Sequence, residues 1–132
     1  MTKNPITMGI DEPFSCVWDK LRNNRIRHLP VIDKDRKVVG MVTQRDLYRI
    51  MSPRKTMDGN YVYDKAELDK FILKHVMRKK LILLSPEDTI GKAIDIMATT
   101  KYGCIPITDN KNILKGVITQ IDVLKAIAKY FL

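Results

Sequence analysis

Apolar positions near the start of the chain follow the period of a helix. Two acids and a proline at residues 11–13 favour a helix start, and Asn23-Asn24 favours its end. Residues 6–8 form a short extended entry before it. Four side chains between these limits have the i, i+3, i+4, i+7 spacing of one helical face: Phe14, Val17, Trp18 and Leu21.

The pattern then changes to that of short β-strands. Aliphatic residues at 28–32 and 38–42 flank a charged turn at residues 33–37, which predicts two strands joined by a tight connection. The second strand runs through Thr43-Gln44 into another helix. On that helix we expect an inward-facing group of three: Leu47, Ile50 and Met51.

The whole pattern returns 76 residues later. Residues 81–84 are extended, residues 85–88 are expected to open a helix, and strands are predicted at 105–108 and 114–118. The first of the two helices has an apolar face of Ile90, Ala93, Ile94 and Met97, and the second is expected to bury Val123, Leu124, Ile127 and Ala128. Six identities recur in register: Pro30/Pro106, Asp33/Asp109, Gly40/Gly116, Thr43/Thr119, Gln44/Gln120 and Asp46/Asp122.

The chain is therefore an internal repeat of a strand–helix–strand–strand–helix unit, an α+β fold. We place the first repeat at residues 1–51 and the second at 76–132. One copy would bury too little surface to be stable alone, so the two are expected to pack together. Residues 52–75 match neither copy and are interpreted as a connecting insertion, with a short helix at 66–75; it could be a tether, a lid or an extra dimer contact.

Composition restricts the class of protein further. A chain of 132 residues with 45% hydrophobic and 30% charged residues is typical of a globular domain. No apolar run reaches the roughly 18 residues needed to span a bilayer, and the start of the chain lacks a secretory segment. Cys16 and Cys104 do not correspond across the repeat and have no metal-ligand spacing, so we expect reduced thiols and a cytoplasmic location.

The net charge of +9 favours anionic partners in general, such as nucleic acid, acidic lipid or phosphorylated small molecules. The basic residues are scattered, with local density at 22–27, 54–55 and 78–80, and no nucleic-acid-binding motif accompanies them. Direct binding of nucleic acid is therefore not the expected function.

The doubled motif apolar-Pro-apolar-apolar-Asp, turn, Gly-apolar-apolar-Thr-x-x-Asp resembles a tandem pair of cystathionine-β-synthase (CBS) domains, called a Bateman module. The resemblance covers residues 4–51 and 77–130. It implies two β-α-β-β-α repeats packed about a pseudo-twofold axis, modules that commonly form homodimers, and clefts that bind AMP, ADP, ATP or S-adenosylmethionine. It further implies a non-catalytic sensor with no obligatory cofactor, which could regulate a separate effector protein in trans.

The Thr-x-x-Asp element can be interpreted in two ways, as a helix cap or as a ligand-binding site. Thr43 with Asp46, and Thr119 with Asp122, fit a helix capping box at a strand-to-helix junction. The resemblance instead implies that the threonine contacts a ligand phosphate and that the aspartate binds the ribose hydroxyls. Both roles can coexist, because the hydroxyl can cap the helix in the empty state and turn to the ligand in the bound state.

The residues before each proline differ between the copies. Leu29-Pro30 and Ile105-Pro106 could line a pocket for the base or belong to the core. By the resemblance, Arg27, His28 and Arg45 would give the first site cationic contacts for phosphates. The second site has Gly103 and Cys104, with Ile121 in place of the second arginine. We therefore expect inequivalent sites, the first preferring the more highly phosphorylated ligand, unless the arginines are only solvated surface charges.

Two other functions remain open from the sequence. One is a structural dimerisation module with no ligand, and the other is a basic nucleic-acid-binding protein. An enzyme is not expected, because no residue near His28 or Cys104 in sequence completes a catalytic arrangement. Nor does any grouping suggest a metal site.

Overall fold

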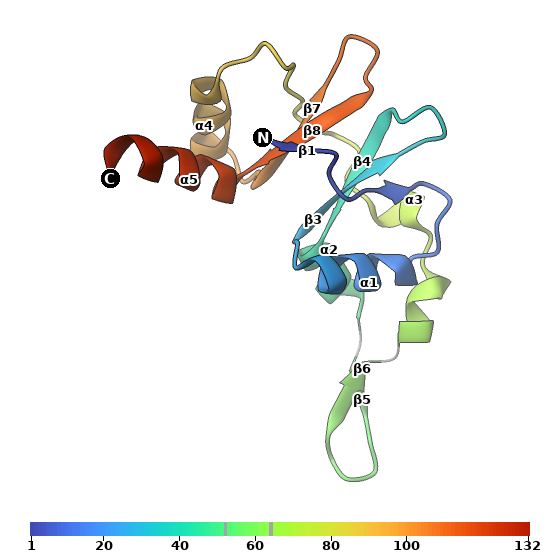
Figure 1. Ribbon diagram of the computed structural model, residues 1–132. Coiled ribbons are helices and arrows are strands. Elements are labelled where there is room, and N and C mark those ends of the chain that lie inside the picture. Colours follow the sequence, from blue (N-terminus) through green and yellow to red (C-terminus); the bar gives the residue numbers. More distant parts are fainter. Residues whose placement is uncertain (52, 64) are drawn as a thin grey trace. The chain divides into compact units, whose positions relative to one another are not determined.

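The computed structural model describes residues 1–51, 53–63 and 65–132. Ser52 and Asp64, both in the predicted insertion, lie outside the described residues. The helices are α1 (Ser15–Asn24), α2 (Gln44–Ile50), the 3₁₀ helix η1 (Lys65–Lys70), α3 (Leu73–Val76), α4 (Ile90–Thr99) and α5 (Gln120–Phe131) (Figure 1). The strands are β1 (Thr2–Lys3), β2 (Met8–Gly9), β3 (His28–Ile32), β4 (Val38–Thr43), β5 (Pro53–Lys55), β6 (Tyr61–Tyr63), β7 (Cys104–Thr108) and β8 (Leu114–Thr119).

These elements form two compact units. The first-repeat unit comprises residues 6–33 and 39–79, and the second-repeat unit comprises residues 1–5, 34–38 and 80–132. Each contains a three-stranded sheet, with strand order β2-β3-β4 in the first-repeat unit. The second-repeat sheet has the order β1-β8-β7, and its N-terminal strand comes from the first residues of the chain. The prediction of an α+β fold built from two strand–helix–strand–strand–helix repeats is confirmed.

The two units repeat the same pairings at equivalent positions. In the first-repeat unit β2 runs parallel to β3, with Met8 opposite Val31. In the second-repeat unit Leu84 makes the corresponding parallel bridge to Ile107, 76 positions further along. The repeat seen in the sequence is therefore a repeat of hydrogen-bonded structure and not only of composition.

In each repeat a short segment pairs with the second strand, and a glycine on that strand leaves room for it. In the first-repeat unit Arg78 bridges Met41, with N–H···O distances of 2.8 and 2.9 Å in the two directions. In the second-repeat unit Thr2 pairs with Val117 at the equivalent place. A Cβ at Gly116 would lie 2.7 Å from the Thr2 carbonyl oxygen, and one at Gly40 would lie 3.1 Å from the Arg78 carbonyl oxygen. The motif glycines are therefore required by the close approach of this segment.

Part of the insertion belongs to the core of the first-repeat unit. Side chains of α1, β3, β4 and α2 form a buried cluster that also contains Leu68, Leu73 and Met77. The described part of the insertion therefore does more than tether the repeats. The helix expected at 66–75 is instead the 3₁₀ turn η1 followed by the short α3, because an extended Ile72 interrupts the helical pattern.

The first helix of each repeat begins after the acidic residues that were expected to start it. α1 starts at Ser15, and its N-cap residue is Phe14, whose side chain cannot accept a hydrogen bond. The Glu12 carboxylate instead accepts the Gly9 N–H at 2.5 Å and pairs with Lys20 at 2.9 Å. α4 starts at Ile90 with Thr89 as its cap, while Asp88 accepts the Ser85 N–H. The acids at these positions thus close a turn before the helix instead of capping it.

The prediction of which α5 residues are buried is largely wrong. Val123 is buried among the second-repeat core residues, but Leu124, Ile127 and Ala128 are exposed. On α2, by contrast, Leu47 and Met51 are buried and Ile50 packs against the same core. Helical spacing identified an apolar face on α5, and nothing in the described chain covers most of it.

Candidate functional site

The two Thr-x-x-Asp elements form capping boxes at the starts of α2 and α5. The Asp46 N–H donates to Thr43 Oγ1 at 3.2 Å and the Thr43 N–H donates to Asp46 Oδ2 at 2.9 Å. Thr119 and Asp122 make the same pair of bonds at 3.2 and 2.9 Å. The capping interpretation is therefore confirmed. Because a carboxylate offers about four acceptor positions, each aspartate retains the chemistry to accept ligand hydroxyls as well.

Each capping box is held against the segment that precedes the motif proline. The Gln44 N–H donates to the Arg27 carbonyl at 2.9 Å, and the Gln120 N–H donates to the Gly103 carbonyl at 3.1 Å. These bonds join the first turn of each second helix to the start of β3 or β7. The residues predicted for each site, at 27–30 with 43–46 and at 103–106 with 119–122, therefore come together within their own repeat.

His28 lies in a group of charged side chains at the first of these sites. Burial lowers the pKa of His28 below its ordinary value of 6.5, and the nearby Arg27 and Arg78 lower it further, while Asp46 opposes the shift. His28 is therefore neutral near pH 7. The positive charge around His28 comes from Arg27 and Arg78 and not from the histidine, as the sequence interpretation assumed. Arg45 is exposed, and its role at this site stays a prediction.

Arg78 is the residue of this group that the sequence interpretation missed. Its backbone bridges Met41 on β4, which brings the side chain into the electrostatic surroundings of His28. The sequence showed a basic run at residues 78–80, but nothing local related that run to a site 50 residues earlier. Only the strand pairing with Met41 provides the connection.

Cys104 occupies the position equivalent to His28, beside Asp122. Burial raises the pKa of the Cys104 thiol to about 12, and the negative charge of Asp122 contributes to the shift. The thiol is therefore protonated at physiological pH and is a poor nucleophile. The two sites share a backbone arrangement but differ in charge, with arginines around the first and a neutral thiol in the second.

The residues on either side of the motif prolines are buried. Leu29, Pro30, Ile105 and Pro106 are all among the most deeply buried side chains of the protein. This burial favours the core interpretation for their side chains. A role for Leu29-Pro30 and Ile105-Pro106 as the wall of a base pocket stays a prediction.

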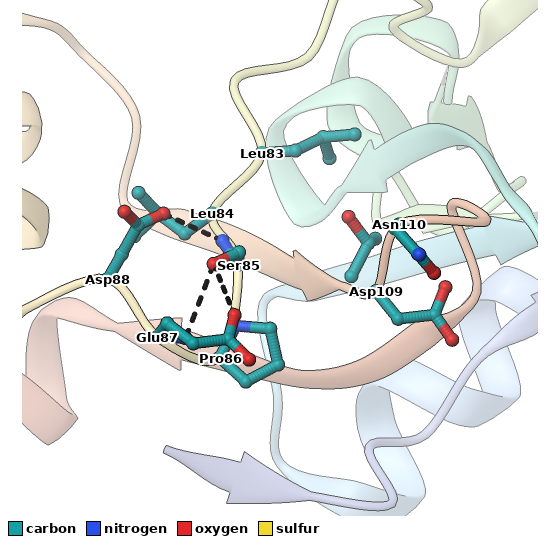
Figure 2. Close-up of a pocket in the computed structure, with 9 residues that line it drawn as sticks. Leu83, Leu84, Ser85, Pro86, Glu87, Asp88, Asp109 and Asn110 are labelled. Atoms are coloured by element: carbon teal, nitrogen blue, oxygen red, sulfur yellow. Dashed lines mark hydrogen bonds between the residues drawn. The ribbon is translucent and has the colours of Figure 1, made fainter.

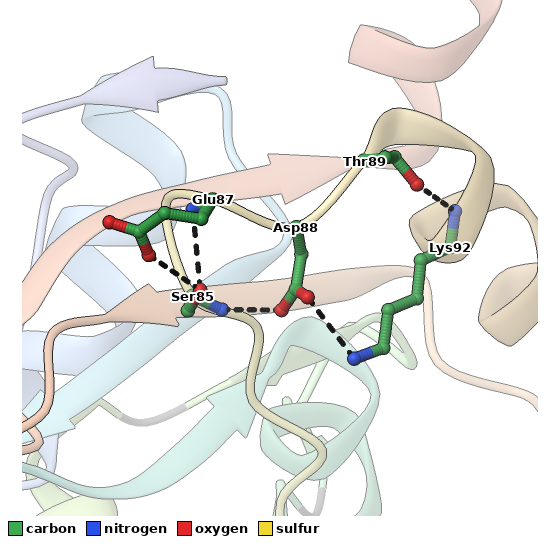
Figure 3. Close-up of polar contacts among 5 residues, drawn as sticks. All are labelled: Ser85, Glu87, Asp88, Thr89 and Lys92. Carbon is green, nitrogen blue, oxygen red and sulfur yellow. Dashed lines mark hydrogen bonds and ion pairs between the residues drawn. The ribbon is translucent and has the colours of Figure 1, made fainter.

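A pocket of about 600 Å³ lies in the second-repeat unit, away from the predicted residues (Figure 2). It is lined by residues 83–88 and by Thr108, Asp109 and Asn110, at the opposite end of β7 from Cys104 and Thr119. Three carboxylates make this pocket unsuited to phosphate. All three serve local structure. Asp88 accepts the Ser85 N–H and pairs with Lys92, and Glu87 accepts the Ser85 hydroxyl (Figure 3). Asp109 accepts the N–H groups of Lys111 and Ile113.

Metal-binding clusters and membrane-spanning helices are two features that the described residues do not contain. No group of three histidine, cysteine or acidic side chains there is arranged to hold a metal ion. None of the helices in that same part of the chain combines the length and apolarity needed to cross a bilayer.

Comparison with known proteins finds relatives that match nearly the whole length of this chain. The chain is 28% identical over 130 residues to a CBS domain-containing protein of Dictyostelium discoideum, covering 98% of this chain and 88% of that protein. It is 30% identical over 126 residues to inosine-5'-monophosphate dehydrogenase of Aquifex aeolicus. The aligned region covers 95% of this chain but 23% of that enzyme. Another relative, the uncharacterized protein MJ1225 of Methanocaldococcus jannaschii, is 27% identical and is matched over 45% of its length. The chain thus spans less than half of two of these three relatives.

Solved structures show the same fold. The crystal structure of CBSX2 in complex with AMP superposes with a TM-score of 0.80 at 19% identity, covering 98% of this chain and 93% of that one. The CBS domain pair of protein MJ0100, in complex with 5'-methylthioadenosine and S-adenosyl-L-methionine, gives a TM-score of 0.79 at 18% identity with the same coverage. The family model for the CBS domain matches residues 1–53 and 73–129. The chain therefore belongs to the CBS domain family.

Proposed function

We propose that this protein is a regulatory module that binds an adenine nucleotide or a related adenosyl compound and has no catalytic activity of its own. The observation that carries the proposal is the repeated arrangement at the two sites. In each repeat an aspartate at the start of a helix lies near the first residue of the strand that contains the motif proline. Asp46 lies near His28 in the first repeat, and Asp122 lies near Cys104 in the second. A carboxylate fixed in this way is suited to accept the two hydroxyls of a ribose.

The likeness to structures solved with adenosyl ligands supports the class of ligand. AMP in CBSX2, and methylthioadenosine with S-adenosylmethionine in MJ0100, share the adenosine group and differ in what is attached to its 5' position. We therefore propose that adenosine is the common element recognised here, and that AMP, ADP, ATP or S-adenosylmethionine is the ligand.

We propose that the two sites are inequivalent. Arg27 and Arg78 place positive charge around His28, and Arg45 is exposed next to Asp46 in the sequence. Guanidinium groups bind phosphate oxygens with well-directed hydrogen bonds. Both sites have an aspartate, but at the first site Arg27 and Arg78 act beside Asp46, whereas Asp122 is the one charged group of the described residues that acts on Cys104. The first site is therefore proposed to take the more highly phosphorylated ligand.

The neutral state of the reactive groups supports a regulatory function over catalysis. The Cys104 thiol is protonated, and His28 is surrounded by arginines and one helix-capping aspartate instead of a nucleophile. We propose that the protein acts in the cytoplasm as a homodimer and regulates a separate effector protein in trans.

The test is calorimetric titration of the full chain with AMP, ADP, ATP and S-adenosylmethionine, after a thermal-shift screen. A ligand at 100 times its dissociation constant should stabilise the fold by about 2.7 kcal/mol. Asp46→Asn and Asp122→Asn keep an oxygen that can accept the capping N–H but remove the charge. Because hydrogen bonds to a charged group are worth about 1.5–3 kcal/mol, each substitution should weaken binding at its own site by about 10- to 100-fold.

A matched control separates ligand binding from helix capping. Thr89→Ala removes the side-chain cap of α4, where Thr89 Oγ1 accepts the Lys92 N–H at 3.2 Å, and Thr89 belongs to neither proposed site. It should lower stability by about 1 kcal/mol and leave affinity unchanged. Absence of binding by any of the four compounds, in folded protein free of nucleotide, would refute the proposed function and leave a structural dimerisation module.

A further inference from the structure

The pocket at residues 83–88 and 108–110 contains hydrogen-bond acceptors that neither of the proposed adenosyl sites uses (Figure 2). We call it the β7 pocket, because it lies at the end of β7 opposite to Cys104. Its walls combine apolar side chains with three carboxylates: Leu83, Leu84, Pro86, Glu87, Asp88 and Asp109. Apolar walls with a few convergent polar groups are typical of small-molecule sites, and carboxylates favour a cationic ligand.

The first repeat shows what the equivalent groups bind. Thr7 and Glu12 lie 76 positions before Leu83 and Asp88. In the first-repeat unit Lys20 Nζ donates to the Thr7 carbonyl at 2.6 Å and to Glu12 Oε2 at 2.9 Å. A carbonyl and a carboxylate at this place in the repeat therefore form an ammonium site, which the first repeat fills with a lysine of the same chain.

The second repeat keeps both acceptors but not the lysine. The Ser85 N–H holds the Asp88 carboxylate at 2.8 Å, as the Gly9 N–H holds the equivalent carboxylate of the first repeat. Ile96 takes the position of the lysine, and its apolar side chain packs against the second-repeat core. The Leu83 carbonyl therefore has no ammonium partner, and it accepts no hydrogen bond from any other described residue.

Thr108 adds a second acceptor that lacks a protein partner. It is 6% exposed and lines the β7 pocket, yet its hydroxyl makes no hydrogen bond with another described residue. Its carbonyl also loses a donor. In the first repeat the Ile32 carbonyl accepts the Ile10 N–H at 3.0 Å, but the residue equivalent to Ile10 is Pro86, which has no N–H. A nearly buried hydroxyl without a protein partner is uncommon, and here it opens into a pocket.

Asp88 retains the capacity to bind a ligand although Lys92 pairs with it. Lys92 Nζ lies 3.2 Å from Asp88 Oδ1 in an i,i+4 pair whose lysine side chain is 58% exposed (Figure 3). Such exposed pairs are weak, and a carboxylate offers about four acceptor positions. The Ser85 N–H, with Lys92, lowers the pKa of Asp88, so the carboxylate is charged at neutral pH.

We infer that the β7 pocket binds the ammonium group of a small organic amine, at the place that the Lys20 ammonium occupies in the first repeat. The three N–H donors of an ammonium match the Leu83 carbonyl, the Asp88 carboxylate and the Thr108 hydroxyl. The carbon chain of the amine lies along the apolar wall, which includes Pro86. This ligand is distinct from the proposed adenosyl compound, because the acceptors of the β7 pocket and its carboxylates disfavour a phosphate.

Titration of the ¹⁵N-labelled full chain with n-butylamine at pH 7, followed by two-dimensional NMR, tests the site without any nucleotide. The amine is protonated at this pH, as a lysine side chain is. We expect saturable shifts of the amide signals of residues 83–85, 87–88 and 108–110. Uncharged n-butanol, which has the same carbon chain, should bind at least about 10-fold more weakly. Because the net charge of +9 repels cations in general, saturable binding reports a local site.

A pair of matched variants tests the carboxylate. Asp88→Asn keeps an oxygen for the Ser85 N–H but removes the charge, and it should weaken n-butylamine binding by more than about 10-fold. Asp95→Asn removes the same charge from an exposed position of α4 that does not line the pocket, and it should leave the affinity unchanged.

A further variant supplies the ammonium from the chain itself. Ile96→Lys installs the residue that the first repeat carries at this position, and it should abolish n-butylamine binding. Ile96→Met is its control, because it is similar in length and uncharged, and it should still bind. Shifts that do not saturate, an equal response to n-butanol, or binding that survives both Asp88→Asn and Ile96→Lys would each overturn the inference. None of these results depends on whether an adenosyl ligand binds at the other end of β7.

Discussion

Replacing Gly40 by alanine should destabilise the protein, although glycine-to-alanine changes commonly stabilise. The new Cβ would lie 2.5 Å from Met77 Sδ, 2.9 Å from Met77 Cγ and 3.1 Å from the Arg78 carbonyl oxygen. Met77 is buried in the first-repeat core, so its side chain has little room to retreat. Arg78 is held in place by its two hydrogen bonds to Met41.

The size of the effect follows from two opposing contributions. Overpacking of a buried contact costs about 1–3 kcal/mol. Alanine recovers about 0.4–1 kcal/mol by restricting the unfolded chain, and no positive φ at Gly40 opposes it. Taken at their midpoints, the two contributions leave a net loss of about 1.3 kcal/mol, which should lower the melting temperature by about 5 °C for a chain of this size.

Thermal unfolding followed by circular dichroism measures this loss, and Gly91→Ala is the control. Gly91 lies in the first turn of α4, where the nearest atom to a new Cβ is Thr89 Oγ1 at an ordinary 3.7 Å. That substitution should stabilise the protein by about 0.5–1 kcal/mol. The same chemical change thus has opposite expected signs at the two positions. If Gly40→Ala also stabilised the protein, as is expected of Gly91→Ala, the reasoning would be refuted. The close packing of residues 77–78 against β4 would then not be the reason for glycine at position 40.

Two further predictions concern the groups whose pKa is shifted. Because the pKa of His28 is lowered on folding, the unfolded chain takes up its proton first as the pH falls, so stability should be full above about pH 7 and decline below its ordinary value of 6.5. Thermal melts between pH 7.5 and 5, above the range where carboxylates titrate, should show this decline in wild type and a smaller one in His28→Gln; equal declines would assign it to other groups. The Cys104 thiol, with its pKa raised to about 12, should resist iodoacetamide at pH 8 while the half-buried Cys16 reacts faster, as mass spectrometry of labelled peptides would show. Equal labelling of both cysteines would contradict the burial of Cys104.

The strands and the capping boxes could be predicted because their signals are local. Pro30 and Pro106, the polar turns after them and the Thr-x-x-Asp elements specify backbone geometry within a few residues. The structure places β3, β4, β7 and β8 within one residue of the predicted strands. Both capping boxes form with both of their hydrogen bonds.

The candidate site could be predicted only in part. Arg27 and His28, with Asp46, were chosen from one motif, and the Gln44-to-Arg27 hydrogen bond does bring the two segments together. Arg78 could not be found, because its place beside His28 depends on a strand bridge between positions 37 residues apart. The neutral state of His28 was missed for a related reason, since it depends on burial and on charges from three different segments.

The sequence by itself determined the repeat, the elements and their order, because periodicity and turn residues act over short distances. Only the tertiary structure decided what covers each apolar face. Leu124 and Ile127 have the same helical spacing as buried residues, yet they are exposed, while Phe14 is closed by an insertion more than 50 residues away. Helical periodicity encodes that a face is apolar, but whether it faces a core, a segment of the same chain or a partner depends on contacts between distant residues.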